Sequence, residues 1–347
     1  MKRLVAAVVM MVSGMLVCGC GSIYNPPVIK SITPSSYTIP ASFFSAKQFG
    51  VSPKVSALEG YATDGVNNFL FGKTKITQTD SAWNQTYANA KPFAGMTGMT
   101  LDHLGDGEVS NGYIYEAIAC SASDRNCGPR NKAIAVYAAS TVGLPLVNWA
   151  DITSSSCDAE SGIAVGPNNT LYVASFYANP SQLCLFDATT LESKGTLTLS
   201  TPIPYVQGIS YNAAAQQFAV SSVSASKIIG YIYFVTPSGE VSGPYLTPQK
   251  DEVEGLDYTQ GYIGYDVSSV IEYIFPFQVT GSGFEPGVVV YGNTLNRQTF
   301  YQNSGSLISV VKATTMSGFG SVKIKVVNPG LLGGTSNTVK LTVSAAN

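Results

Sequence analysis

The sequence predicts an all-β protein made of a β-propeller of about five blades and a small β-sandwich. The middle of the chain repeats a unit that starts at a glycine, and its C-terminal part alternates apolar and polar residues in short runs. The composition agrees, because charged residues are only 12% of the chain while Gly (34) and Tyr (20) are abundant, as in exported proteins built from strands and turns. The length is sufficient for two domains.

The N-terminal residues predict export and a lipid anchor. Lys2 and Arg3 precede an apolar run, residues 4–17, that is shorter than the roughly 20 residues needed to span a bilayer and fits a signal peptide. The following VCGC resembles a bacterial lipobox. The resemblance implies a lipoprotein signal peptide at 1–19 and acyl chains, palmitate among them, on Cys20. The alternative is an ordinary signal peptide that is cut nearby.

The rest of the chain bears on localisation and partners. No second apolar stretch approaches membrane-spanning length, so we expect the lipid to be the membrane anchor in the cell envelope. Gly21, rather than Asp, follows the predicted acylated cysteine, which favours the outer over the inner membrane. The 19 Lys+Arg balance 21 Asp+Glu, and this excludes the basic surface typical of nucleic-acid binding.

Four cysteines remain after the leader, an even number that predicts disulfides in an oxidising compartment. Of the three possible connectivities we favour Cys120–Cys127, which closes the polar loop CSASDRNC, together with Cys157–Cys184. A zinc site is the alternative. The spacing argues against it, because no CxxC occurs and the only histidine, His103, lies far from these cysteines in the sequence.

The C-terminal stretch predicts the sandwich, with strand-like runs bounded by Gly, Pro and Asn. Its elements VTGSGF (279–284), PG (286–287), VVNPG (326–330) and the closing GGTSNTVKLTV resemble an IPT/TIG domain, which has an immunoglobulin-like fold. The resemblance implies this fold and says little about function.

The opening strand and PSS turn of such a domain do not occur directly before Phe277. They are found at the other end of the chain, in PPVIKSITPSSYTIPASFF. We therefore predict one discontinuous immunoglobulin-like domain, residues 26–44 plus 274–345, with the propeller, residues 45–273, inserted into it. The alternative is a separate N-terminal linker followed by a truncated domain.

The inserted stretch contains a degenerate repeat of a polar residue, a glycine, a short strand, a turn and an aromatic-rich strand. We place the unit starts at Gly60, Gly98, Gly162, Gly208 and Gly255, which are 38, 64, 46 and 47 residues apart. A period of roughly 40–50 residues with several strands per unit predicts a propeller. Residues 45–57 are expected to add the strand that the last blade lacks.

This repeat resembles propellers of the NHL, YncE-like and gluconolactonase-like groups. Enzymes among them line the channel with carboxylates and Asn, often around a divalent cation. Glu59, Glu160 and Glu254 each stand near a unit glycine, as does Gln207, so they can converge on Ca²⁺, which prefers oxygen ligands. The alternative is that each side chain caps a turn or binds a neighbouring strand. The chain departs from the enzyme groups, since it offers no histidine for such a site and no GxSxG motif.

The sequence thus predicts a non-enzymatic lipoprotein that binds a protein or carbohydrate ligand with a propeller displayed on an immunoglobulin-like domain. The second hypothesis is a cation-dependent hydrolase or lactonase with its site in the propeller channel. Tyrosines on or beside the blade strands fit either interior packing or ligand binding at a wet surface. They are Tyr113, Tyr115, Tyr172, Tyr177, Tyr231, Tyr233, Tyr262 and Tyr265.

Overall fold

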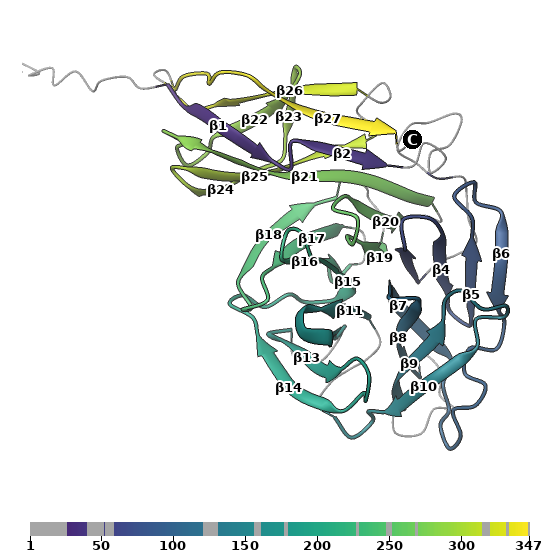
Figure 1. The fold of residues 1–347 in the computed structure, drawn as a ribbon. Helices are drawn as coiled ribbons and strands as arrows, with labels where there is room; N and C mark the ends of the chain where they lie inside the picture. Colours follow the sequence, from purple (N-terminus) through teal and green to yellow (C-terminus); the bar gives the residue numbers. More distant parts are fainter. Residues whose placement is uncertain are drawn as a thin grey trace, which may run out of the picture.

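The structure is a computed structural model that describes residues 26–39, 52, 59–120, 131–155, 161–176, 180–226, 229–247, 252–267, 270–313, 320–330 and 333–345. Within these ranges the chain forms mainly strands and turns, with a 3-10 turn at Pro167–Asn169. No helix in this part of the chain is long and apolar enough to cross a membrane. A propeller and a β-sandwich lie side by side (Figure 1).

The propeller has five blades of antiparallel strands. Within each blade the strands are named from the central axis outward (Figure 1). Blade 1 is β3 (Gly60–Thr63), β4 (Asn68–Gly72), β5 (Lys75–Thr79) and β6 (Gln85–Asn89), and blade 2 is β7 (His103–Ser110), β8 (Tyr113–Ala119), β9 (Lys132–Ala138) and β10 (Leu146–Asp151). Blade 3 is β11 (Gly162–Gly166), β12 (Thr170–Ala174), β13 (Gln182–Asp187) and β14 (Ser193–Thr198), and blade 4 is β15 (Val206–Asn212), β16 (Gln217–Val223), β17 (Gly230–Val235) and β18 (Val241–Leu246). Blade 5 is β19 (Val253–Asp257), β20 (Ile263–Val267) and β21 (Val270–Ser282).

The blades pack face to face, so their central strands are buried on both sides. This explains why a strand such as β8, with the sequence YIYEAIA, is nearly continuous in apolar residues. Phe69 and Ile114 belong to one apolar cluster that joins blades 1 and 2. The rings of Tyr172 and Phe218, 4.5 Å apart, join blades 3 and 4. Each such fully buried large apolar side chain contributes about 1.5–3 kcal/mol to folding.

The repeat unit of the second blade starts at a different residue from the predicted one. Gly98 lies in the turn before β7 with open space around it, and its φ is +83°. The residue that aligns with the blade glycines is Asp106, which forms a parallel bridge with Gly162. Counted from Gly60, Asp106, Gly162, Gly208 and Gly255, the intervals become 46, 56, 46 and 47 residues. The long interval contains the CSASDRNC loop.

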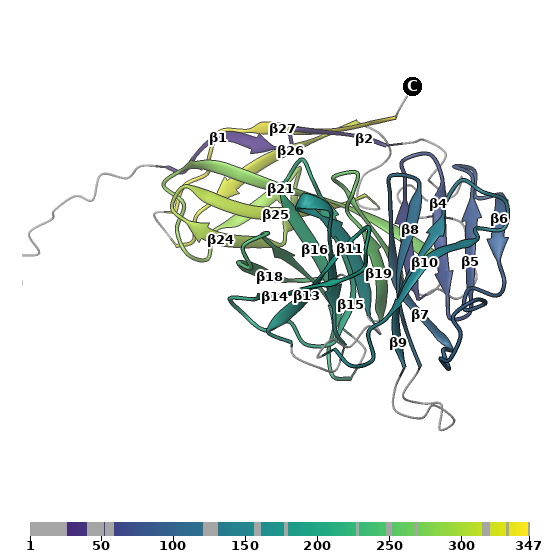
Figure 2. The same ribbon diagram turned by 60° about the horizontal axis from the view of Figure 1, so that its bottom comes forward.

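Strand β21 belongs to both domains. Its first part pairs with β20, and from Ile274 onward it pairs with β25 (Ser306–Lys312) of the sandwich. Figures 1 and 2 show it running out of blade 5 into the sandwich as one long strand. At the junction Lys312 Nζ lies 2.5 Å from Glu272 Oε2, and the Tyr265 hydroxyl donates to the same oxygen at 2.9 Å. The two domains are therefore connected by a continuous strand and a buried ion pair.

The sandwich takes strands from both ends of the chain. One sheet is β1 (Val28–Thr33), β21, β25 and β24 (Thr299–Asn303), and the other is β2 (Ser36–Ile39), β27 (Val339–Ala345), β26 (Gly320–Val327), β22 (Val289–Gly292) and β23 (Leu295–Arg297). β1 pairs antiparallel with β21, and β2 pairs in parallel with β27. The predicted fold class, an all-β propeller of about five blades with a small immunoglobulin-like sandwich, is confirmed. Residues 40–44 of the predicted first segment lie outside the described residues.

Blade 5 is contacted by the segment that precedes blade 1. The Ser52 N–H donates to Ile271 O at 2.9 Å, and the Ile271 N–H donates to Ser52 Oγ at 2.8 Å. Residue 52 therefore lies against the outer strand of this blade. The other residues of the strand predicted at 45–57 lie outside the described part of the chain.

Candidate functional site

The inner strands of the propeller meet around the buried carboxyl group of Asp106. A Cβ on Gly208 or Gly255 would come within 2.3 Å of its oxygens, so only glycine fits at those positions. Asp106 Oδ1 accepts the backbone N–H of Tyr61 at 3.0 Å, and Oδ2 accepts that of Leu256 at 3.2 Å. One carboxyl group thus fills the space left by the glycines and binds the neighbouring strands.

Two further buried carboxyl groups bridge blades beside it. Glu108 accepts the N–H of Val165 at 2.9 Å and that of Tyr211 at 3.1 Å, which links blades 2, 3 and 4. Asp257 of blade 5 accepts the N–H of Thr63 of blade 1 at 3.0 Å. These carboxyl groups satisfy backbone donors that burial would otherwise leave unpaired. Their first role is therefore structural.

Burial shifts the titration of these groups. It raises the pKa of Asp106 well above its usual range, that of Glu108 to about 8 and that of Asp257 to about 6, because the charged forms lose hydration. Repulsion from Asp257 adds to the rise at Glu108, and the backbone donors oppose it in part. The centre of the propeller therefore holds carboxyl groups that take up protons more readily than carboxyl groups in water.

Two of the carboxylates predicted to hold a cation, Glu59 and Glu254, contact polar side chains in the structure. Glu59 Oε2 is 3.6 Å from His103 Nε2. The Gln207 amide donates to Glu254 at 2.9 Å, and Glu160 lies outside the described residues. Across the described ranges no three His, Cys, Asp or Glu side chains are close enough to hold one metal ion. The calcium site stays a prediction.

The predicted disulfide and lipidation sites lie only partly within the described residues. Cys120 and Cys184 are each disulfide-bonded. Cys127 and Cys157 lie outside the described residues, so the favoured pairing remains a prediction, and so does lipidation of Cys20.

The blade tyrosines have mixed surroundings. Five of them are buried in the interior and serve packing, namely Tyr115, Tyr172, Tyr233, Tyr262 and Tyr265. Tyr113 is 41% exposed, Tyr231 is half-buried and Tyr177 lies outside the described part. Neither Tyr113 nor Tyr231 lines the cleft described next.

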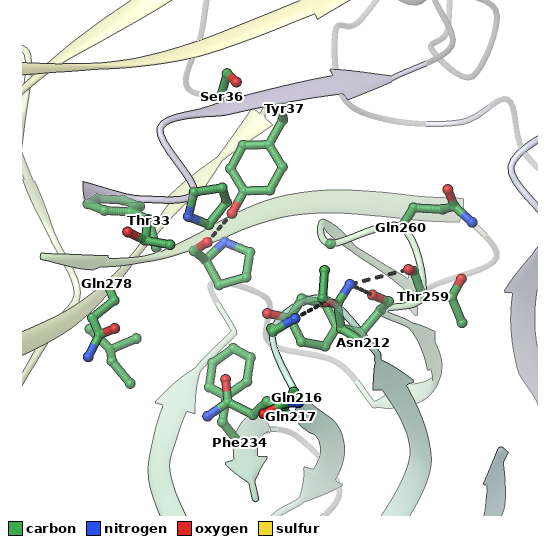
Figure 3. Close-up of a pocket in the computed structure, with 18 of the residues that line it drawn as sticks. Thr33, Ser36, Tyr37, Asn212, Gln216, Gln217, Phe234, Thr259, Gln260 and Gln278 are labelled. Atoms are coloured by element: carbon green, nitrogen blue, oxygen red, sulfur yellow. Dashed lines mark hydrogen bonds between the residues drawn. The ribbon is translucent and has the colours of Figure 1, made fainter. Parts of the chain in front are cut away.

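A cleft of about 740 Å³ lies between the propeller and the sandwich. Figure 3 shows Tyr37 and Gln278 of the sandwich on one side and Asn212, Gln216 and Gln217 of the propeller on the other. The Tyr37 hydroxyl donates to the carbonyl of Pro276 on β21, which fixes the sandwich wall. The propeller wall consists of the turns after β15 and after β19.

The lining of the cleft combines polar and apolar residues. Among the described residues that line it there is no Asp, Glu, Lys, Arg or His. Six residues with side-chain amides line it, namely Asn212, Gln216, Gln217, Gln260, Gln278 and Gln302, beside the apolar residues Tyr37, Phe234, Tyr258, Phe277 and Ile308. An amide both donates and accepts hydrogen bonds. The arrangement therefore suits a neutral ligand that does the same.

The walls of the cleft are held rigidly. Tyr245 of β18 packs edge-on against Phe300 of β24, with ring centroids 3.8 Å apart. Tyr262 of the propeller contacts Phe275 of β21, and both belong to the same apolar core as the sandwich residues. An extensive apolar junction suppresses the relative motion expected of weakly joined domains. The cleft is preformed rather than created by domain closure.

A second pocket, of about 310 Å³, lies at the mouth of the propeller channel. Glu108 and Tyr211 line it, together with Asp64 in the turn after β3. Thr259 and Gln260 line both this pocket and the cleft, so the two cavities adjoin.

Sequence reasoning missed the cleft because it followed the residues at the starts of the repeat units. The cleft is lined instead by the turns at the far ends of the inner strands β15 and β19. A usable signal was present in the glutamine-rich turn NAAAQQ at residues 212–217, which carries no charge.

No protein-family model and no curated protein matches the chain. Solved structures do resemble it. Hydrazine synthase of Kuenenia stuttgartiensis is 11% identical with a TM-score of 0.38, covering 83% of this chain and 68% of that one. XC5397 of Xanthomonas campestris, described as a gluconolactonase, is 16% identical with a TM-score of 0.40, covering 60% and 67%. A chain of the mitotic checkpoint complex is 9% identical with a TM-score of 0.36, covering 78% and 98%. Likeness at this level carries no functional argument.

Proposed function

We propose that this chain is a lipid-anchored cell-envelope protein that binds a neutral, hydroxyl-rich ligand, a saccharide, in the cleft between propeller and sandwich. The observation that carries the proposal is the cleft lining, which in the described part of the chain consists of amides and aromatic and aliphatic side chains without an ionised group. Sugar hydroxyls both donate and accept, as amides do. The volume lies within the roughly 300–1,000 Å³ of small-molecule sites, and domain interfaces are a preferred place for them.

We propose binding rather than catalysis in this cleft. Glycoside hydrolysis generally needs two carboxyl groups that flank the scissile bond. No carboxyl group lines the cleft in the described part of the chain. The cleft therefore supports recognition without an acid–base pair.

The proposed lipid anchor would attach on the sandwich side. β1, the first described strand, belongs to the sandwich and starts at Val28. Cys20 precedes Val28 by eight positions, and an extended chain of eight residues spans at most about 28 Å. We propose that the sandwich lies next to the membrane and carries the propeller.

The test is calorimetric titration of the chain from residue 22 onward with neutral saccharides. We expect saturable binding that Gln260→Ala and Gln216→Ala each weaken at least tenfold. The matched control is Gln85→Ala, an exposed glutamine on β6 outside the cleft, which should leave the affinity unchanged. Absence of saccharide binding, or binding that is indifferent to both cleft variants, would overturn the proposal.

The hydrolase alternative requires a cation held by Glu59, Glu160 and Glu254. A calcium titration followed by thermal unfolding tests it separately. One bound ion adds about 2.7 kcal/mol to the free energy of unfolding when the free calcium concentration is a hundredfold above the dissociation constant. Stabilisation that disappears in Glu59→Gln and Glu254→Gln would favour the hydrolase. If millimolar calcium gives no stabilisation, the alternative loses its cation site.

A further inference from the structure

We propose that the cleft and the channel-mouth pocket together form one groove that binds a linear, non-acidic saccharide of several units. This inference rests on the proposed function and deepens it from a sugar to a chain of sugars.

The two cavities share a boundary formed by Ala213, Ala214, Ala215, Thr259 and Gln260, which we call the saddle. Thr259 and Gln260 line both, while in the neighbouring turn Ala213 lines the pocket and Ala214 and Ala215 line the cleft. The three alanines are exposed. Because their side chains end at Cβ, these three residues place no long side chain between the cavities. A ligand can therefore continue from one into the other.

The saddle is a fixed surface. Asn212 Oδ1 accepts the N–H of Ala215 at 2.6 Å, and its amide nitrogen donates to the carbonyls of Tyr258 at 3.0 Å and Thr259 at 3.2 Å (Figure 3). Asn212 is only 3% exposed. One buried amide thus joins the turn of blade 4 to the turn of blade 5, and the floor under the proposed chain is preorganised.

The charges of the groove select against acidic chains. The cleft has no ionised lining residue, and the channel-mouth pocket adds two carboxyl groups, Asp64 and Glu108. No Lys, Arg or His lines either cavity among the described residues. A uronate or phosphate on the ligand would meet the carboxyl group of Asp64 without a compensating cation, and Glu108, whose pKa is raised to about 8, adds its negative charge only at higher pH. Hydroxyl groups would meet acceptors and amides.

A peptide is the less suitable occupant. Extended peptides bind most strongly by adding to a free strand edge. β21, which runs along the cleft, pairs with β25 on one side, and on the other with β20 up to Ile274 and with β1 from Gln278. Only residues 275–277 lie between these two pairings, and there Pro276 has no N–H while its carbonyl accepts the Tyr37 hydroxyl. The rest of the floor consists of turns, whose side-chain amides suit hydroxyl groups.

The test is a length series of neutral oligosaccharides, from two to six units, of β-1,4-linked and of α-1,4-linked glucose, titrated into the chain from residue 22 onward. We expect affinity to rise at least tenfold with length and then to level off. Ala214→Trp, which raises the saddle, should reduce the affinity for the long chains to that for the short ones. Ala82→Trp, at an exposed alanine in a turn of blade 1, is the control and should leave the affinities for long and short chains unchanged.

The outcomes separate this inference from the proposed function. Equal affinity for short and long chains, with no effect of Ala214→Trp, would overturn the groove and leave the saccharide cleft standing. Failure of every saccharide to bind, or binding of neutral peptides instead, would overturn both. Oligogalacturonate of the same length should bind at least tenfold more weakly, and equal binding would contradict the exclusion of acidic chains.

Discussion

The carboxyl group of Asp106 accepts the backbone N–H of Leu256 at 3.2 Å, although 150 positions separate the two residues in the chain. Its other oxygen accepts the N–H of Tyr61. Leu256 lies in blade 5 and Tyr61 in blade 1, so a side chain of blade 2 binds both ends of the ring. The closure of the propeller depends on this one residue as well as on packing between blades.

Replacing Asp106 should therefore weaken the whole propeller. Asp106→Ala leaves two buried N–H groups without an acceptor, each costing about 1–3 kcal/mol. We expect a corresponding loss in the free energy of unfolding, measured by urea denaturation. Glu240→Ala, at an exposed glutamate just before β18, should change stability by less than about 0.5 kcal/mol. Equal midpoints for the two variants would contradict the closing role.

Stability should fall as pH rises from 5 to 8. Burial raises the folded-state pKa of Glu108 from 4.5 to about 8 and that of Asp257 from 3.8 to about 6, so in these windows the folded protein holds protons that the unfolded chain releases. Each such group lowers the free energy of unfolding by up to about 1.4 kcal/mol per pH unit inside its window. Urea denaturation at pH 5, 6.5 and 8 measures the slope, and Glu108→Gln should reduce it. A free energy of unfolding that rises from pH 5 to pH 8 would contradict the raised pKa values of Glu108 and Asp257.

Removing the carboxyl group of Glu116 should stabilise the protein. This side chain is fully buried between blades 1 and 2, and neither oxygen has a hydrogen bond of normal geometry in the described part of the chain. Burial, and then repulsion from Asp106, raises its pKa well above 4.5, with the backbone of Gly105 opposing in part. Glu116→Gln does not titrate, so its advantage over the wild type should grow with pH.

The comparison to make is the free energy of unfolding of wild type and Glu116→Gln at pH 4.5 and pH 8. We expect a difference of at least about 1 kcal/mol in favour of the variant at pH 8 and a smaller one at pH 4.5. A variant that is less stable than the wild type at pH 8 would show that the carboxyl group has a stabilising role.

The ion pair at the domain junction gives a prediction of its own. Lys312 and Glu272 are 15% and 8% exposed, and Lys312→Met removes the cation from a buried carboxylate, at a cost of about 3–5 kcal/mol. Lys312→Met combined with Glu272→Met should be less destabilised than the sum of the single variants. A double-mutant cycle by chemical denaturation measures this coupling. Additive effects would mean that the pair is not coupled.

Much of the fold was predictable from local pattern. Alternation in VKLTV and the glycine-bounded runs around residues 279–292 indicated the sandwich, and the spacing of Gly162, Gly208 and Gly255 indicated the blades. The residue at which the repeat unit of blade 2 starts was not predictable. The glycines are required by crowding around the axis, and an aspartate in the same place is recognisable only once the ring has closed around it.

The candidate site was less accessible to sequence reasoning than the fold. Carboxylates were expected in the channel at Glu59, Glu160 and Glu254, and that set stays a prediction. The structure shows buried carboxyl groups at Asp106, Glu108 and Asp257, which the sequence analysis did not select. The cleft was not foreseen at all. Its walls come from Tyr37 near one end of the chain, a turn at residues 212–217 and the strand β21, and their approach depends on how the two domains dock.

By itself the sequence determined the secondary-structure class, the repeat and the resemblance of both chain ends to one domain, because strand periodicity and turn residues act over a few positions. Only the tertiary structure decided that Asp106 completes a ring of glycines, that β21 serves two sheets and that uncharged amides meet across a cleft. These features depend on distances between residues far apart in the chain, and ring closure and domain packing set those distances.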